Sequence, residues 1–140
     1  MSTTVSAIRK SVLVDAPPER AFELFTAGIA SWWPRDTHSY AGERVTDVVF
    51  EGAVGGRVYE VADEGEQDWG RVVEFDPPRG FRLEWLIGGA SGSEVCVTFA
   101  PEGAGSRVEL VHDGFKADGV RDDYAGGWDV VLAPFARAAR

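Results

Sequence analysis

The sequence predicts an α+β fold in which a seven-stranded antiparallel sheet wraps around a long C-terminal helix. One observation is a succession of short, strand-like segments joined by Gly- and Pro-containing turns between residues 44 and 112. Another is the segment 124–140, where apolar residues recur at steps of three and four and trace one helix face. A third is the content of five Trp, eight Phe and three Tyr residues, which favours an apolar space between helix and sheet.

The first third of the chain predicts one strand followed by two short helices. Apolar residues alternate over residues 8–14, which is the pattern of a strand. Asp15 is placed to cap the next helix, and the two prolines after it suit the first helical turn, where a missing N–H costs nothing. Gly28 interrupts this helix, and Pro34 ends a second helical piece.

Short strands dominate the middle of the chain. They are expected at residues 45–51, 57–61, 69–75, 81–87, 94–100 and 107–112. Their spacing and their short turns predict an antiparallel meander. The acidic stretch at residues 63–68, between two of these strands, is interpreted as a solvated loop.

The final helix is expected from about Val120 to Ala139 and is the only element long enough to cover the sheet. Gly126 and Gly127 each cost this helix about 1 kcal/mol relative to alanine. Pro134 cannot donate a backbone hydrogen bond and is expected to kink or break the helix. No linker divides the chain, so residues 1–140 are interpreted as one domain.

The composition argues against several classes of function. A net charge of −9 argues against non-specific binding to nucleic acid or to an anionic membrane surface. The single Cys96 excludes an internal disulfide and a cysteine-based metal cluster, and its two valine neighbours predict a buried apolar position. No apolar run reaches 18 residues and the N-terminus lacks a signal-peptide core, so a soluble cytoplasmic protein is expected.

Few residues offer catalytic chemistry. No nucleotide-binding or hydrolase motif is present, and the two histidines lack a third ligand at zinc-site spacing, so no cofactor or metal is expected. His112 ends a strand on its apolar face, where it would be either hydrogen-bonded structure or a ligand contact. Glu60 is a second candidate for proton transfer if Tyr59 faces solvent, because Glu60 then faces the cavity. His38 is expected in a loop, either exposed or at the pocket rim.

Three stretches resemble a known family. They are APPERAFELFTAGIASWWP at residues 16–34, WGRVVEFDPPRGFRLEW at residues 69–85, and VHDGF followed by GWDVVLAPF within residues 111–135. The chain is similar to the START-like (SRPBCC) helix-grip superfamily and, within it, to proteins like the C-terminal domain of the Hsp90 ATPase activator. The resemblance covers nearly the whole chain and implies a pocket between helix and sheet. The superfamily includes lipid carriers, receptors, cyclases and co-chaperones, so the fold does not fix the function.

The leading hypothesis is a binding protein for a small hydrophobic or aromatic molecule. Aromatic residues on both sides of the expected cavity favour it, because flat side chains form an apolar surface and each indole N–H offers one directed contact. Trp32 and Trp33 are expected to close one end of the cavity. The expected ligand-binding residues are Trp32, Tyr59, Trp69, Trp85, Val97, His112, Trp128, Val131 and Phe135.

Two alternatives stay open. A cyclase or hydrolase would use the same pocket, with His112 or Glu60 transferring the proton. An interaction module resembling the co-chaperone domain would use an exposed surface around Trp33 and the loop to Tyr40, although a standalone chain lacks the additional domain of the co-chaperone. Edge strands or Trp33 could also pair two chains as a homodimer.

Overall fold

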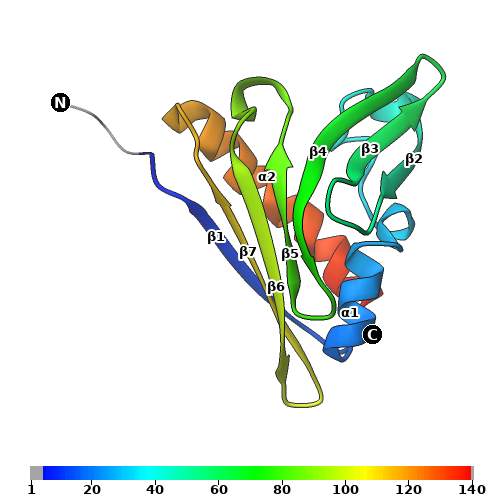
Figure 1. The fold of residues 1–140 in the computed structure, drawn as a ribbon, viewed down its shortest axis with the longest axis vertical. Helices are drawn as coiled ribbons and strands as arrows, with labels where there is room; N and C mark the ends of the chain where they lie inside the picture. The colour runs from blue at the N-terminus through cyan, green and yellow to red at the C-terminus, as the bar shows by residue number, and fades with distance from the viewer. Residues whose placement is uncertain (1–4, 140) are drawn as a thin grey trace.

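One antiparallel sheet of seven strands and the long helix α2 (Asp118–Ala138) form most of the computed structural model, which describes residues 5–139. Residues 1–4, part of the N-terminal stretch considered above for a signal peptide, and Arg140 lie outside the described residues. In Figure 1, α2 runs along one face of the sheet. The predicted fold class is therefore confirmed.

The strands follow the predicted meander, with the first strand added beside the last. They are β1 (Ile8–Val14), β2 (Val45–Phe50), β3 (Arg57–Ala62), β4 (Gly65–Asp76), β5 (Gly80–Trp85), β6 (Glu94–Glu102) and β7 (Gly105–Asp113). Their order in the sheet is β1-β7-β6-β5-β4-β3-β2. The pairings β2–β3, β3–β4 and β4–β5 each contain a register shift, and such irregularities increase the local twist. Figure 1 shows β2, β3 and β4 turned away from β1 and β7.

Short helices connect the strands. They are α1 (Pro18–Phe25), η1 (Ile29–Ser31), η2 (Gly42–Arg44) and η3 (Gly88–Ala90). Pro18 occupies the first turn of α1 as expected, but the cap position is Pro17 and no side chain caps the helix. The prediction that Asp15 caps α1 is therefore wrong. The backbone N–H of Asp15 instead donates to the carbonyl of Ala139 at 3.2 Å, which ties the end of β1 to the end of α2.

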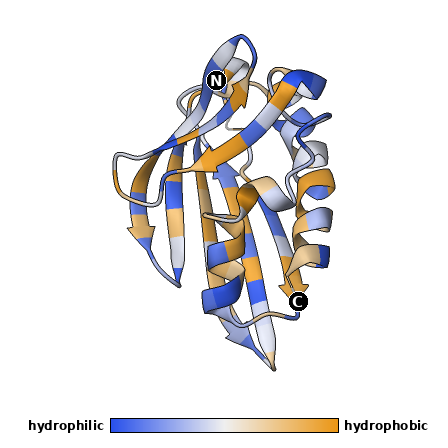
Figure 2. Cartoon of the chain, turned by 90° about the vertical axis from the view of Figure 1, so that its right-hand side faces the viewer, coloured by the Kyte–Doolittle hydropathy of each residue, from blue (hydrophilic) through white to orange (hydrophobic). Residues whose placement is uncertain are grey.

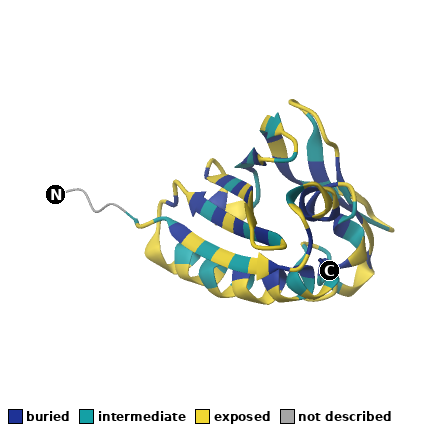
Figure 3. Cartoon of the chain, turned by 90° about the horizontal axis from the view of Figure 1, so that it is seen from below, coloured by how far each residue is buried: buried dark blue, intermediate teal, exposed yellow. Residues whose placement is uncertain are grey.

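A cluster of phenylalanines fills the space between α1, the sheet and the C-terminal half of α2. Phe25 lies 4.9 Å from Phe135 and 5.6 Å from Phe81, measured between ring centroids. Hydrophobic and hydrophilic residues alternate along the strands in Figure 2, and buried and exposed residues alternate in Figure 3. This alternation directs one set of side chains into the core. Around Phe135, the space between α2 and the sheet is therefore filled by aromatic side chains.

Two predictions about local structure need correction. Of the kink or break expected at Pro134, a break is absent: helix α2 continues through this residue, because Val131 and Phe135 on either side of it are buried and hold both halves against the core. Val130, whose carbonyl loses its helical partner, is 48% exposed, so this face is open to water. The acidic stretch is also not a loop. Most of it belongs to β4, because Arg57 on the neighbouring strand binds Glu66 at 2.9 Å and Asp68 at 2.6 Å and balances their charge.

Cys96 also differs from its prediction. The alternation of β6 turns Val95 and Val97 into the core, so Cys96 lies between them on the opposite face and is half-buried. Partial burial raises the pKa of its thiol.

Candidate functional site

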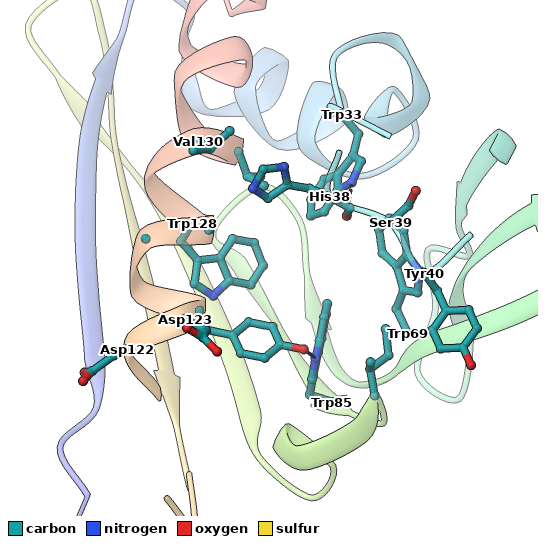
Figure 4. A pocket seen from close by; sticks show the side chains of 15 residues that line it. Trp33, His38, Ser39, Tyr40, Trp69, Trp85, Asp122, Asp123, Trp128 and Val130 are labelled. Atoms are coloured by element: carbon teal, nitrogen blue, oxygen red, sulfur yellow. Dashed lines mark hydrogen bonds between the residues drawn. The ribbon is translucent and has the colours of Figure 1, made fainter. Parts of the chain in front are cut away.

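A cavity of about 580 Å³ lies between the N-terminal half of α2, the segment 33–40 and the strands β4 and β5. This volume is in the range of pockets that bind drug-sized molecules. Figure 4 shows Trp128 on one side, Trp69 opposite, and His38, Ser39 and Tyr40 on the connecting segment. The lining residues are Trp33, His38, Ser39, Tyr40, Trp69, Trp85, Ile87, Asp122, Asp123, Tyr124, Gly126, Gly127, Trp128, Val130 and Val131.

Four tryptophans form the floor of this cavity, and we refer to Trp33, Trp69, Trp85 and Trp128 as the tryptophan tetrad. Their rings form a closed circuit, with neighbouring centroids 4.8, 6.4, 6.0 and 6.1 Å apart. The same four residues line a void of only about 20 Å³ on the inner side. The tetrad therefore separates an open outer cavity from a filled core.

Every indole N–H in the chain has a partner within the protein. Trp32 donates to the carbonyl of Leu24, Trp33 to that of His38, Trp69 to Glu60, Trp85 to the hydroxyl of Tyr124 and Trp128 to His112, at 2.6–3.1 Å. The expectation that indole N–H groups contact a ligand is therefore wrong. The tetrad offers a ligand its aromatic surface and no hydrogen-bond donor.

His112 lies behind the tetrad, with none of its surface exposed. The indole of Trp128 can only donate, so Nδ1 of His112 accepts this bond at 3.1 Å and carries no proton. The proton of the neutral ring is then on Nε2, which donates to Ser93 Oγ at 2.7 Å, and Ser93 donates onward to the carbonyl of Ala90. Burial lowers the pKa of His112 from 6.5 to about 4, although Asp113 opposes the shift. The neutral side chain of His112 thus links β7 to α2 through its hydrogen bond with Trp128.

Glu60 is buried and holds the segment that roofs the cavity. As a carboxylate it accepts hydrogen bonds from the backbone N–H groups of Tyr40 at 2.6 Å and Ala41 at 2.8 Å, and from the indole of Trp69 at 2.6 Å. Tyr59 faces outward, and the guanidinium of Arg57 lies over its ring. An outward Tyr59 is the arrangement for which the sequence predicts that Glu60 faces the interior. Glu60 therefore points inward, but its oxygens are occupied by the protein.

The polar groups that do reach the cavity gather at its mouth. His38 lines the cavity, its Nδ1 lies 2.8 Å from Thr37 Oγ1, and its Nε2 has no partner among residues 5–139. Tyr124 accepts the bond from Trp85, so its own hydroxyl proton remains available, and burial raises its pKa. Asp122 and Asp123 lie on α2 beside them.

Of the nine residues expected to bind a ligand, the structure places Trp69, Trp85, Trp128 and Val131 on the cavity wall. The other five lie elsewhere. Trp32 and Phe135 pack on each other in the core at 5.1 Å, and Val97 is fully buried. Tyr59 faces outward, and His112 lies behind the tetrad. Strand alternation identifies an inward face but not which part of that face is covered by other side chains.

Sequence reasoning missed most of the mouth. Trp33 was expected to close one end of the cavity, and it does so as part of the floor. Tyr124 belongs to the apolar stripe of the final helix, but Asp122 and Asp123 have no recognisable pattern. In residues 5–139 no group of three His, Cys, Asp or Glu side chains is arranged to hold a metal ion. No helix there is long and apolar enough to cross a membrane.

Comparison with known proteins then identifies the family. The sequence profile described as "Activator of Hsp90 ATPase homolog 1-like protein" matches residues 15–140. The chain belongs to this family. The resemblance found in the sequence is therefore confirmed, whereas no curated protein matches the chain.

Several solved structures share the fold. A solution structure of an Aha1 dimer from Colwellia psychrerythraea has 18% identity and a TM-score of 0.73, covering 96% of each chain. Protein CV1439 from Chromobacterium violaceum has 25% identity and a TM-score of 0.68, covering 96% of this chain and 97% of its own. An anthrahydroquino-gamma-pyrone synthase, Txn09, has 34% identity and a TM-score of 0.62, covering 98% of this chain and 99% of its own.

Proposed function

We propose that this protein binds a flat aromatic molecule in the cavity above the tryptophan tetrad. The observation that carries the proposal is that four tryptophan rings line the cavity while their indole N–H groups are all used internally. A ligand gains by burying apolar ring surface against this floor, at roughly 25 cal/mol for each Å² removed from water. It places its polar substituents toward His38, Tyr124 and the aspartates at the mouth. The similarity to an enzyme whose name describes a fused aromatic product supports this ligand class.

The test is to fill the cavity without disturbing its floor. A Cβ atom added at Gly126 would meet no atom within 4 Å beyond its own stretch of helix, and Gly126 lines the cavity. Gly126→Leu is therefore expected to occupy ligand space while the tetrad stays intact. Gly119 is a matched control, because it lies on the same helix, also faces open space, and is not part of the cavity.

Binding is measured by thermal shift with anthracene-type probes and by quenching of tryptophan fluorescence. A probe at 100 times its dissociation constant adds about 2.7 kcal/mol to the free energy of unfolding, which raises the melting temperature of a domain of this size by roughly 5–10 °C. We expect this shift in the wild type and in Gly119→Leu, and its loss in Gly126→Leu. Equal shifts in both variants would contradict the cavity assignment, and no shift with any aromatic probe would contradict the proposal.

An enzyme that closes aromatic rings is the second candidate function. The 34% identity with Txn09 favours it, as does the position of His38, whose free Nε2 lies at the cavity where a proton acceptor would be required. His38 replaces His112 and Glu60 in this role, because their polar atoms are engaged inside the protein. Turnover of a bound polyketide-type substrate that disappears in His38→Gln while binding persists would establish an enzyme. An interaction with a chaperone rests on the family description alone, and a pull-down that recovers no chaperone removes it.

A further inference from the structure

We propose that the cavity selects planar aromatic molecules that carry a positive charge, with the cationic group held at the mouth by Asp123. This inference rests on the proposed function and adds the charge of the ligand to it. Its basis is the cavity as a whole, in which aromatic faces form the floor and carboxylates stand at the entrance. Both features attract cations, and they lie on the same path into the site.

The charges at the mouth are negative. Two carboxylates line the cavity, and no Lys or Arg among residues 5–139 does so. Arg121 is adjacent in sequence, but its guanidinium donates to the carbonyls of Ser6 and Ala7 and to Asp122 at 3.3 Å. Asp123 has no hydrogen bond or ion pair with any described residue. In Figure 4 its carboxylate lies nearer the cavity than that of Asp122, which points outward.

The helix dipole opposes this negative field but does not cancel it. Asp122 and Asp123 lie in the first turns of α2, where unpaired N–H groups amount to about half a positive charge. Asp118 adds a third carboxylate to the same turns, while Arg121 supplies one compensating cation. The sum at this end of α2 therefore remains negative. The net charge of −9 for the whole chain acts in the same direction.

The floor attracts a cation through the aromatic faces. A cation within about 6 Å of an indole face is attracted by the ring quadrupole, and Trp is the strongest of the aromatic residues in this respect. Because each indole N–H is turned to a partner in the protein, a ligand meets the apolar π-surface of the tetrad and no N–H donor. An anionic group in the same place would be repelled by the aromatic rings and by the two carboxylates, and no Lys or Arg among residues 5–139 lines the cavity to balance it.

Three probes with one ring system and different charges test the proposal. They are 9-(aminomethyl)anthracene, a cation at neutral pH, 9-(hydroxymethyl)anthracene, which is neutral, and anthracene-9-carboxylate. Dissociation constants are measured by fluorescence titration at low salt and at pH 8, above the ordinary pKa of histidine. We expect the amine to bind about tenfold more tightly than the alcohol, and the carboxylate more weakly than both.

Two neutralising variants on α2 locate the effect. Asp123→Asn is expected to weaken binding of the amine about threefold or more and to leave the affinity for the alcohol unchanged. Asp129→Asn removes the same charge from the same helix, but Asp129 pairs with Lys10 outside the cavity, so amine affinity is expected to stay the same. Gly126→Leu shows that the amine binds in the cavity, since surface attraction to an acidic protein would survive that substitution.

The outcomes separate the two proposals. Equal affinity for the amine and the alcohol, or an equal loss in Asp123→Asn and Asp129→Asn, overturns the charge selectivity and leaves aromatic binding standing. Tighter binding of the carboxylate also overturns the charge selectivity alone. Absence of cavity binding by all three probes overturns both proposals.

Discussion

The buried His112 makes the stability of this protein depend on pH in a defined window. In the unfolded chain a histidine takes up a proton near its ordinary pKa of 6.5, whereas in the folded protein burial lowers the pKa to about 4. Between these values the unfolded state binds more protons than the folded state. Stability contributed by the neutral ring is therefore fully present above pH 6.5 and is lost as the pH falls toward 4.

The expected loss follows from the difference between the two pKa values. Each pH step of one within the window costs about 1.4 kcal/mol, which gives about 3 kcal/mol between pH 7 and pH 4. The structural cause is burial, because a charged ring at this site has no exposure to water, and protonation of Nδ1 would also remove the acceptor of the indole N–H of Trp128. This loss is a large fraction of the 5–15 kcal/mol that is typical of folded domains.

Urea unfolding between pH 7 and pH 4 measures the effect, and His112→Gln provides the reference. Glutamine cannot take up a proton, so the difference in unfolding free energy between wild type and variant is expected to fall by about 3 kcal/mol across the window. Carboxylates that titrate in both proteins cancel in this difference. His38→Gln is the control, because the chain has only these two histidines and His38 lies at the cavity mouth. Parallel curves for wild type and His112→Gln would refute the reasoning.

Two further substitutions test the support of the site. Glu60→Gln leaves three N–H donors with one acceptor oxygen. We therefore expect the free energy of unfolding in urea to fall by about 2–3 kcal/mol. Because the roof segment is released, we also expect faster tryptic cleavage after the exposed Arg35. Unchanged cleavage would show that the roof does not depend on Glu60. Gly126→Ala removes a helix-interior glycine that faces open space. It is expected to increase the free energy of unfolding by up to about 1 kcal/mol and to raise the melting temperature by roughly 3–5 °C. A lower melting temperature would mean that the position is not open.

Much of the fold could be predicted because strand alternation and helical periodicity are local properties of the sequence. The strand at Ile8–Val14 has the predicted bounds, and the helix α2 covers the predicted segment. The acidic stretch was misassigned because its charges are balanced by Arg57 on another strand, a contact that no local pattern reveals. Propensity is overridden by such tertiary contacts.

The site was harder to predict because it depends on which side chains cover one another. Trp85 and Phe135 both point into the space between helix and sheet, but only Trp85 reaches the cavity, since Phe25 and Trp32 cover Phe135. The two histidines show the same limit. His112 occupies a regular position on a strand and is fully buried, whereas His38 lies in an irregular segment and lines the cavity.

Three members of the tryptophan tetrad are held in place by hydrogen bonds to polar groups of the protein. His112 accepts from Trp128, Glu60 accepts from Trp69, and the backbone of His38 accepts from Trp33. A tryptophan that rotated to follow a ligand would break such a bond in a buried position, at a cost of about 1–3 kcal/mol. The floor is therefore rigid, and in the function proposed above it would select ligands by flatness, whereas the polar groups at the mouth would set the charge and substituents that are accepted.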